Sequence, residues 1–453
     1  MNGSLRQGAW RSPDGAAKLA RYALITIGPA ANAGSQFVLS LQTLHHLDPT
    51  SFGEFSFLLV ASVFSWSVWS ALFCAPLPVL MAQGAQELRS ATLRCVFSAS
   101  GAAAVGAGAV FWLLELSLGV AGWAAVVFAL YACFALLRWY ARQYAYVTGA
   151  PMRTLASDLV YGVVLLMGVA AMSITRADSL QAPFLALLVA AAASLLPFGR
   201  SYFARQFLEF SPRDIPRYAE VWRRHSSWSL IGVATTEATA NAHAYMVTFL
   251  LGPSAFAPLS ASALLIRPIG VVMTALGDFE RPRMAKLIHA GEEDDAAQLM
   301  LPFRLALAGT WLCTALAALA LMLYAPRLIF PARYATDYLA EAAAIWMIVA
   351  AVRVARTPES VMLQAAGRFR PLALASVYSS VVSVALVAAL LFSSGALFSL
   401  FGILIGETVF AIWIRRLARD WRRRQGEEGV AAARPESELH APAAMRALGG
   451  GAR

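Results

Sequence analysis

The sequence predicts an all-α integral membrane protein, with about twelve transmembrane helices arranged as two six-helix lobes around a central cavity. Three observations lead to this fold class: the composition, the length of the apolar runs and the distribution of basic residues. Hydrophobic residues make up 59% of the 453 residues and charged residues only 14%, whereas soluble domains carry about a quarter charged residues. Lipid must therefore cover much of the apolar surface.

Twelve apolar runs are long enough to cross a bilayer, because a hydrocarbon core about 30 Å thick needs about 20 apolar residues in a helix. We interpret the first run, 22–44, as a retained span, since the apolar stretch before Ala31-Asn32-Ala33 is too short for a cleaved signal peptide. The remaining runs are 55–81, 96–118, 121–137, 155–174, 182–198, 227–251, 255–276, 305–325, 340–363, 372–393 and 396–414.

Basic residues are distributed unevenly between the loops. With a cytoplasmic N-terminus, only Arg176, Arg327 and Arg333 face the opposite side, which is the positive-inside pattern. Arg138 and Arg142 then fall in the cytoplasmic segment after the fourth run. Both termini are expected in the cytoplasm, and this topology accounts for the net charge of +10 without nucleic acid as a partner. The last cytoplasmic segment holds the cluster Arg415, Arg416, Arg419, Arg422, Arg423 and Arg424.

The chain divides into five segments. Two six-span lobes, 22–198 and 227–424, follow a cytoplasmic N-terminus, 1–21, and are separated by a cytoplasmic linker, 199–226. The last segment, 425–453, consists mainly of Gly, Ala, Glu, Pro and Arg without periodicity and is predicted to be a disordered cytoplasmic tail.

The linker contains the stretch RDIPRYAEVWRRH, in which Tyr218 and Trp222 are interleaved with arginines. This mixture is typical of a helix that lies in the lipid headgroup layer. An ordinary solvated linker is an equally compatible alternative.

An internal repeat relates the two lobes. ANAGSQFVLSL (31–41) resembles ANAHAYMVTFL (240–250), and each is followed by a proline-containing turn, DPTSF (48–52) and GPSAF (252–256). The shared order predicts a duplicated six-helix unit. Because six spans return the chain to the same side of the membrane, the two copies are expected to be parallel repeats.

Polar residues interrupt the first and seventh runs. Glu237, Asn241 and Thr248 share one stripe of the seventh helix, with Tyr245 close to it, and Asn32 with Gln36 forms a similar i, i+4 pair in the first. Polar groups within spans commonly face a bundle interior or a wet cavity. They are therefore predicted to form a polar seam toward the central cavity. The alternative is that they are interhelical hydrogen bonds that hold the lobes together.

Arg267 lies within the eighth run, SASALLIRPIGVVM, directly before Pro268. Proline at this point loosens the helix. Since arginine stays charged in proteins, Arg267 is expected to meet either an anionic substrate or Glu237. A purely structural Arg–Glu pair is the alternative.

Three acids within spans are candidates for ion or proton coupling: Glu237, Glu407 and Asp158. Asp158 lies close to the cytoplasmic face, so a side chain that simply reaches toward water is the alternative for it. The tenth run carries charged residues that are expected to form local i, i+3 pairs with one another, namely Arg353, Arg356 and Glu359.

The sequence holds no GxSxG, Walker A, HExxH or CxxC motif. Its four cysteines lie in apolar runs or at their ends and are interpreted as small hydrophobic residues. We therefore expect no enzyme, no metal or cofactor site and no ATP-driven motor.

The chain resembles the polysaccharide-exporter branch of the MOP superfamily, which includes the Wzx-type O-antigen flippases. The resemblance rests on the six-and-six span pattern, on LGPSAFAPLSASALLIRPIGVVMTALGDFERPRMAKL (251–287) and on AAGRFRP (365–371). It implies a V-shaped pair of lobes in a bacterial inner membrane. By alternating access, these would move a lipid-linked oligosaccharide to the outer leaflet, with Arg267 and Arg21 meeting its diphosphate.

The resemblance also implies partners. These are the lipid-linked oligosaccharide, membrane lipids, a polysaccharide polymerase and chain-length machinery, and the protein itself is expected to be a monomer. Two alternative functions stay open. One is an ion-coupled drug or small-molecule antiporter of the same superfamily. The other is a membrane polysaccharide polymerase or ligase, which the short outer loops disfavour.

Overall fold

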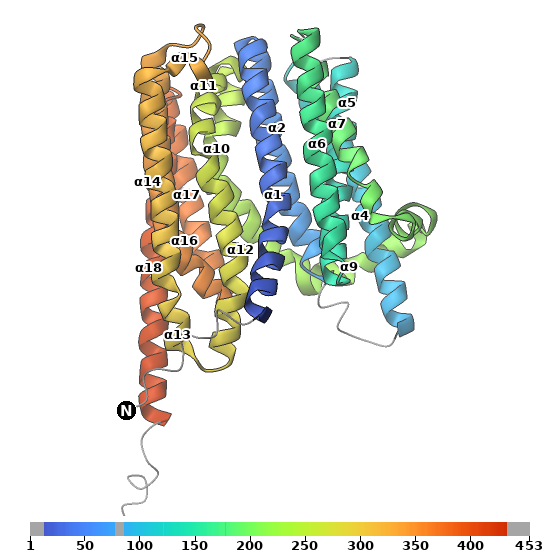
Figure 1. The fold of residues 1–453 in the computed structure, drawn as a ribbon, viewed down its shortest axis with the longest axis vertical. Coiled ribbons are helices and arrows are strands. Elements are labelled where there is room, and N and C mark those ends of the chain that lie inside the picture. Colours follow the sequence, from blue (N-terminus) through green and yellow to red (C-terminus); the bar gives the residue numbers. More distant parts are fainter. Residues whose placement is uncertain (1–12, 78–85, 121, 177, 433–453) are drawn as a thin grey trace, which may run out of the picture.

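The computed structural model describes residues 13–77, 86–120, 122–176 and 178–432, and the regular secondary structure of these residues is helical throughout (Figure 1). Nine helices in this part of the chain are long and apolar enough to cross a membrane. The predicted all-α membrane fold is thus confirmed, and the protein is a multi-pass membrane protein.

The first half of the chain forms a group of helices that we call the first lobe. A π-helical turn, Ser70–Cys74, extends its second helix. The helices are α1 (Pro13–His46), α2 (Pro49–Trp69), α4 (Gln86–Ser117), α5 (Trp123–Val147), α6 (Pro151–Thr175) and α7 (Gln181–Ala193).

The second half forms the second lobe. A short 3-10 turn, Leu264–Ile266, separates α11 from α12 directly before Pro268, as expected where proline removes a backbone donor. The helices are α10 (Ser227–Leu251), α11 (Pro253–Ala263), α12 (Arg267–His289), α13 (Glu293–Gln298), α14 (Met300–Tyr324), α15 (Pro326–Ile329), α16 (Thr336–Ala365), α17 (Phe369–Ser394) and α18 (Ser399–Ala432).

The predicted apolar runs lie in these helices, apart from positions outside the described residues. The runs 22–44, 227–251 and 396–414 fall in α1, α10 and α18, which are helical but are not among the nine helices that meet the length and composition criterion. The count of twelve spans therefore stays a prediction.

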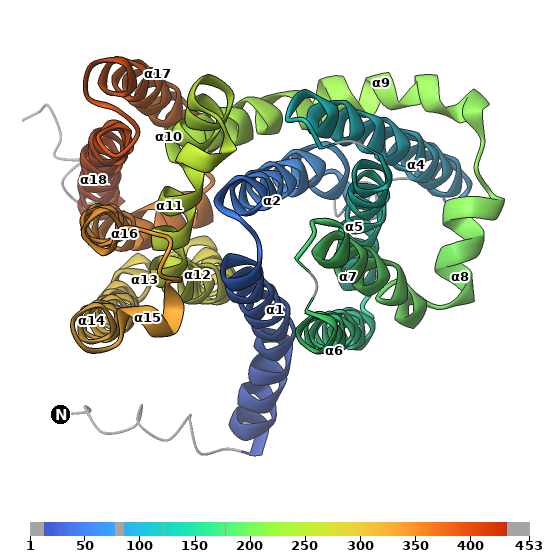
Figure 2. The ribbon, with the colours of Figure 1, turned by 90° about the horizontal axis from the view of Figure 1, so that it is seen from above.

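The two lobes lie side by side, as the view from above shows (Figure 2). In the first lobe α1 packs on α6, and α5 packs on α4 and α7. In the second, α17 packs on α10 and α18, while α16 packs on α12 and α18. The lobes meet through α2, which contacts α10 and α11, and through α1, which contacts α12.

The lobes approach each other closely at the start of α2 and α11. A Cβ atom on Gly53 would lie 1.9 Å from the carbonyl oxygen of Pro253, so only glycine fits there. Further along α2, the Phe57 ring meets the rings of Tyr245 and Phe249 edge-on, with centroids 5.5 Å apart in both pairs. The lobes are therefore sealed to each other at this end of the molecule.

The repeat is visible in the helices. α2 and α11 begin at Pro49 and Pro253, since proline suits the first position of a helix. α1 and α10, which precede them, run in the same direction (Figure 1), as parallel repeats require. The turns between them differ. Asp48 caps α2 by accepting two backbone hydrogen bonds at 2.9 and 3.2 Å, whereas Gly252 precedes α11 with φ +91°.

The linker between the lobes is a chain of short helical turns, which include α8 (Arg200–Phe203) and α9 (Tyr218–Val221). It runs along the outside of α4 toward α10 (Figure 2). The Tyr218 hydroxyl donates to the carbonyl of Leu72 at 2.5 Å, which ties the linker to the end of α2. Phe207 and Leu208 are 48% and 84% exposed. These two residues precede the stretch RDIPRYAEVWRRH, so the headgroup-layer interpretation of that stretch stays a prediction.

The C-terminal helix is longer than predicted. α18 continues past Arg424 to Ala432, where a disordered tail was expected from residue 425. The added stretch contains Gln, Glu and Ala, which are strong helix formers, and it extends a helix that already exists, so no new nucleus is needed. The rest of the predicted tail, 433–453, and the start of the predicted N-terminus, 1–12, lie outside the described residues.

Candidate functional site

The polar stripe predicted on the seventh run is present on α10. Asn241 and Tyr245 follow Glu237 by one and two turns, so all three share a face. The Asn241 side-chain amide donates to Glu237 Oε1 at 3.0 Å, and the Tyr245 hydroxyl donates to the same oxygen at 3.2 Å. All three side chains are half-buried. We call Glu237, Asn241 and Tyr245 the α10 seam.

A buried carboxylate lies next to the α10 seam. Glu407 of α18 is 1% exposed and accepts from Arg353 Nε at 2.7 Å and from Arg356 Nε at 2.8 Å. Arg353 also donates to the carbonyl of Ala240 on α10 at 3.4 Å. We call Glu407, Arg353 and Arg356 the second-lobe cluster. It ties α16, α18 and α10 together.

The predicted local pairs on the tenth helix are wrong. Arg353 and Arg356 both reach across to Glu407 on α18, and Glu359 instead accepts from Arg304 of α14 at 2.6 Å. The reason is geometric, because a single buried carboxylate offers one oxygen to each guanidinium group, and such a pairing cannot be seen from positions on one helix.

The first lobe contains a matching arrangement. Asp158 of α6 is fully buried, and it accepts from Arg138 Nη2 at 2.6 Å and from Arg142 Nη2 at 2.9 Å, both on α5. A Cβ atom on Gly28 of α1 would lie 2.8 Å from Asp158 Oδ2, so glycine makes room for the carboxylate. We call Asp158, Arg138 and Arg142 the first-lobe cluster.

Two sequence interpretations are corrected by the first-lobe cluster. Asp158 does not reach toward water, because two guanidinium groups neutralise it in the interior. Arg138 and Arg142 do not lie in a cytoplasmic loop, because α5 continues to Val147 and both side chains are buried. A signal for them existed: two arginines at i, i+4 precede an acid in the next helix, and a short turn brings consecutive helices together.

The polar pair on the first helix contacts its own lobe. Asn32 Oδ1 accepts from Arg138 Nη1 at 3.2 Å, and the Gln36 amide donates to the Tyr161 hydroxyl at 3.1 Å. These bonds hold α1 to α5 and α6, as the interhelical alternative describes.

Arg267 lies at the junction of the lobes. It is the first residue of α12, and its Nη1 donates to the Ser40 hydroxyl on α1 at 2.9 Å. In the part of the chain that the structure describes, no carboxylate pairs with it. The expected Arg267–Glu237 pair is absent, because Glu237 is bonded within the α10 seam. Arg267 is thus a half-buried cation bound only to a neutral hydroxyl.

Arg21 lies on the first turns of α1, but its side chain is outside the described part of the structure. Glu115 was missed by sequence reasoning. It is fully buried near the end of α4, and neither of its carboxyl oxygens has a hydrogen-bond partner among the described residues. The signal was a single acid within the apolar run 96–118.

Metal-ligating residues do not gather in the described ranges: no group of three or more His, Cys, Asp or Glu side chains is arranged to hold an ion there. In the described part of the chain, the site therefore consists of two double-arginine clusters, the α10 seam and Arg267, a cation that has no carboxylate partner there. The Arg267 guanidinium can bind an anion, and the α10 seam can hold a proton or donate hydrogen bonds.

Comparison with known proteins finds relatives by structure alone. No family model and no curated protein sequence matches the chain. Among solved structures, it is similar to an inward-facing multidrug resistance MATE family transporter of the MOP superfamily. The TM-score is 0.63 with 14% identity, over 90% of this chain and 99% of the other.

Two further structures share the fold. The lipid II flippase MurJ in an inward closed conformation superposes with a TM-score of 0.66 and 11% identity, over 88% of this chain and 87% of that one. A MOP superfamily transporter from Pyrococcus furiosus with a binding pocket of reversed polarity superposes with a TM-score of 0.58 and 14% identity, over 89% of this chain and 96% of that one. The chain therefore has the fold of MOP superfamily transporters. Drug transporters and a lipid flippase both adopt this fold.

Proposed function

We propose that this protein is a flippase that moves a polyprenyl-diphosphate-linked oligosaccharide from the cytoplasmic to the outer leaflet of a bacterial inner membrane by alternating access. The oligosaccharide would belong to a surface polysaccharide such as O-antigen or exopolysaccharide. The observation that carries the proposal is Arg267, a half-buried cation at the lobe junction without a carboxylate partner among the described residues.

The chemistry of Arg267 suits a diphosphate. A guanidinium group binds phosphate oxygens through two parallel hydrogen bonds, and a half-buried cation that is bound only to Ser40 gains a strong partner from such an anion. The polyprenyl tail can stay in lipid while the headgroup crosses. A transporter of cationic drugs would gain nothing from a positive charge at this point.

Alternating access gives the contacts between the lobes a role. The seal at Gly53 and Pro253 would have to open for release at that end, and the Arg267–Ser40 bond would have to break for the lobes to part there. Of the three acids expected to couple, Glu237 suits the role best. A proton on Asp158 or Glu407 would break two ion pairs, whereas the hydrogen-bond partners of Glu237 among the described residues, Asn241 and Tyr245, are neutral.

A second candidate function is an ion-coupled antiporter of a small molecule. The observation that favours it is the α10 seam, where Glu237 is half-buried and bonded to Asn241 and Tyr245. An acid in this setting can exchange a proton or bind a small cation. The fold is compatible with either function.

The deciding experiment locates the lipid-linked repeat unit in a strain that lacks the gene and any redundant flippase. We expect it to accumulate in the cytoplasmic leaflet, and unchanged outer-leaflet delivery would overturn the proposal. Complementation with Arg267→Ala is expected to fail although the protein inserts, and Arg267→Lys to restore transport partly. Arg281→Ala, an exposed arginine of the same helix, is the matched control. Drug sensitivity with normal surface polysaccharide would support the antiporter instead.

The same proposal places the protein, as a monomer, before the polysaccharide polymerase and chain-length machinery, because the flipped repeat unit is their substrate. Loss of flipping is therefore expected to abolish polymerised glycan at the surface while the polymerase itself remains intact.

A further inference from the structure

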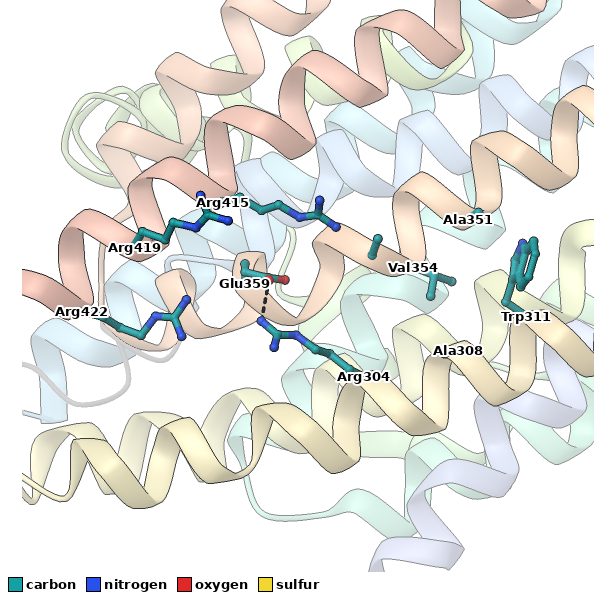
Figure 3. A pocket seen from close by; sticks show the side chains of 10 residues that line it. Arg304, Ala308, Trp311, Ala351, Val354, Glu359, Arg415, Arg419 and Arg422 are labelled. Carbon is teal, nitrogen blue, oxygen red and sulfur yellow. Dashed lines mark hydrogen bonds and ion pairs between the residues drawn. The ribbon is translucent and has the colours of Figure 1, made fainter.

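A pocket of about 580 Å³ is lined by three helices of the second lobe, and these helices lie on the side of that lobe away from the first lobe (Figure 2). It lies between α14, α16 and α18, and Figure 3 shows its side chains. It shares none of its lining residues with the lobe junction or with the α10 seam. Its charged lining residues are Arg304, Glu359, Arg415, Arg419 and Arg422.

The pocket has an excess of positive charge. Arg304 and Glu359 form its ion pair, with 2.6 Å between Nη2 and Oε1. The α18 arginines at 415, 419 and 422 follow the i, i+4, i+7 spacing of a single helix face. Among the described residues none of these three pairs with a carboxylate, and Arg422 Nε donates only to the carbonyl of Ala418. Three like charges on one face repel one another, so a bound anion would stabilise them.

The surroundings indicate a lipid rather than a soluble anion. α14 borders the pocket and faces outward along nearly all of its length, with only 6% of its most apolar stretch buried. Leu305, Leu312 and Leu316 are more than half exposed on it. Trp311 and Ala308 of α14 line the pocket beyond the arginines (Figure 3). Lipid chains can therefore lie on α14 while the headgroup reaches α18.

The positions of the charged and apolar ends of the pocket along α14 agree with this arrangement. Arg304 lies about one turn from the start of α14, and Trp311 lies seven residues further along, which is about 10 Å at 1.5 Å per residue. The charged end is thus at the membrane boundary and the apolar end within the hydrocarbon. Tryptophan is also enriched just inside such boundaries.

We infer that this pocket binds the phosphate headgroup of an anionic phospholipid, with the acyl chains against α14. Arginine forks bind phosphate oxygens in pairs, and basic pockets between transmembrane helices are suited to headgroups that carry two phosphates. Cardiolipin, with two phosphates, fits three arginines that lack a carboxylate. The inference does not depend on the proposed function, because the pocket lies outside the lobe junction.

The test measures lipid binding to the purified, delipidated full chain by native mass spectrometry. Cardiolipin and phosphatidylcholine with the same acyl chains are titrated separately. We expect cardiolipin to bind the unaltered protein, and Arg415→Ala/Arg422→Ala to weaken that binding about tenfold or more, since each arginine near anionic lipid contributes about 1 kcal/mol. Phosphatidylcholine binding is expected to stay the same.

A matched control lies on the same helix. Arg416→Ala/Arg423→Ala removes the same charge at the same spacing, but neither residue lines the pocket. We expect a change of less than about twofold. Equal losses in the two double variants would overturn the inference, because they would show attraction without a site. If the alanine variant does not survive purification, Arg415→Gln/Arg422→Gln, which keeps a polar side chain and removes the charge, replaces it in the same comparison.

Two competition experiments against bound cardiolipin identify which kind of phosphate compound the pocket binds. Inorganic diphosphate at millimolar concentration is expected to leave cardiolipin binding unchanged. If diphosphate displaces cardiolipin, and Arg415→Ala/Arg422→Ala loses diphosphate binding, the pocket would be assigned to a soluble anion. A polyprenyl diphosphate that displaces cardiolipin and binds more tightly would assign the pocket to the transported lipid. Either result would overturn the phospholipid assignment.

Discussion

The first-lobe and second-lobe clusters use the same groups and differ in their access to water. Each holds one carboxylate between two arginines of the fourth long helix of its lobe, α5 or α16. In the first lobe the arginine side chains are 6% and 9% exposed, and in the second they are 24% and 15% exposed. The first cluster is closed, whereas the second is open on its arginine side and bonds to the backbone of α10 at Ala240.

This difference separates two roles for a buried ion pair. A closed cluster fixes the packing of α1, α5 and α6. Removing either partner leaves a buried charge that has neither a counter-charge nor water around it. An open cluster can exchange one partner for water or for a ligand at lower cost. We therefore expect structural effects from changes in the first lobe and functional effects from changes in the second.

The largest effect is expected from Asp158→Asn. It leaves Arg138 and Arg142 buried without a counter-charge, which costs about 3–5 kcal/mol in the free energy of unfolding. Thermal and denaturant unfolding of the purified protein measures the loss, and Asp178→Asn, at an exposed acid, is the control. A loss below 1 kcal/mol would mean that the first-lobe cluster is not a packing element.

A smaller effect is expected from Glu407→Gln in the second lobe. Water can solvate the partly exposed Arg353 and Arg356, so the free energy of unfolding is expected to fall by about 1–3 kcal/mol. Glu341→Gln, at an exposed acid of α16, is the control. Equal losses for Glu407→Gln and Asp158→Asn would remove the distinction between the clusters.

Glu237→Gln is expected to change the free energy of unfolding by less than about 0.5 kcal/mol, because the oxygen of the new amide still accepts hydrogen bonds from Asn241 and Tyr245. Its effect should be on transport. Transport measured in vesicles with an imposed pH gradient is expected to lose its dependence on that gradient. If the dependence persists in the variant, Glu237 is not the coupling acid.

The smallest effect is expected at the turn before α2. Burial raises the pKa of the Asp48 carboxyl, but hydrogen bonds from Ser51 and Thr50 outweigh this and hold the pKa below its ordinary value. The ionised carboxyl therefore stabilises the fold above the unfolded pKa of about 3.9, and this contribution is lost as pH falls through the folded pKa. Asp48→Ala is expected to cost about 1 kcal/mol at pH 7 and less at pH 3.

The matching turn in the second lobe provides the control for Asp48. Gly252 precedes α11 without a side-chain cap, so a second-lobe change such as Gly252→Asn is not expected to reproduce the pH dependence. A loss for Asp48→Ala that is the same at pH 3 and pH 7 would contradict the role of the ionised carboxyl.

The fold could be predicted from the sequence because its causes are local. Apolar runs of span length mark the helices, and prolines such as Pro49 and Pro253 mark where two of them begin. The α10 seam was predictable for the same reason, since positions four residues apart on a helix face the same way.

The rest of the site depends on contacts between distant segments. Arg353 and Glu407 are 54 residues apart, and Arg267 and Ser40 are 227 apart, so nothing local pairs them. The single carboxylate of Glu407 serves two arginines, and Glu237 is taken by neutral neighbours. Helix packing decides which partner an ionisable group finds, and this is why the alternative of an Arg267–Glu237 pair was wrong.

The seal between the lobes is one-sided. Gly53 and Ala257 each follow by four residues the proline that begins their helix, so they are counterparts in the repeat. The opposing carbonyl oxygen occupies the space that a Cβ atom on Gly53 would take, whereas Ala257 carries a methyl group. A perfectly duplicated unit would offer two interchangeable ways to interlock. The glycine in one copy and the alanine in the other make the two matching positions non-interchangeable at this contact.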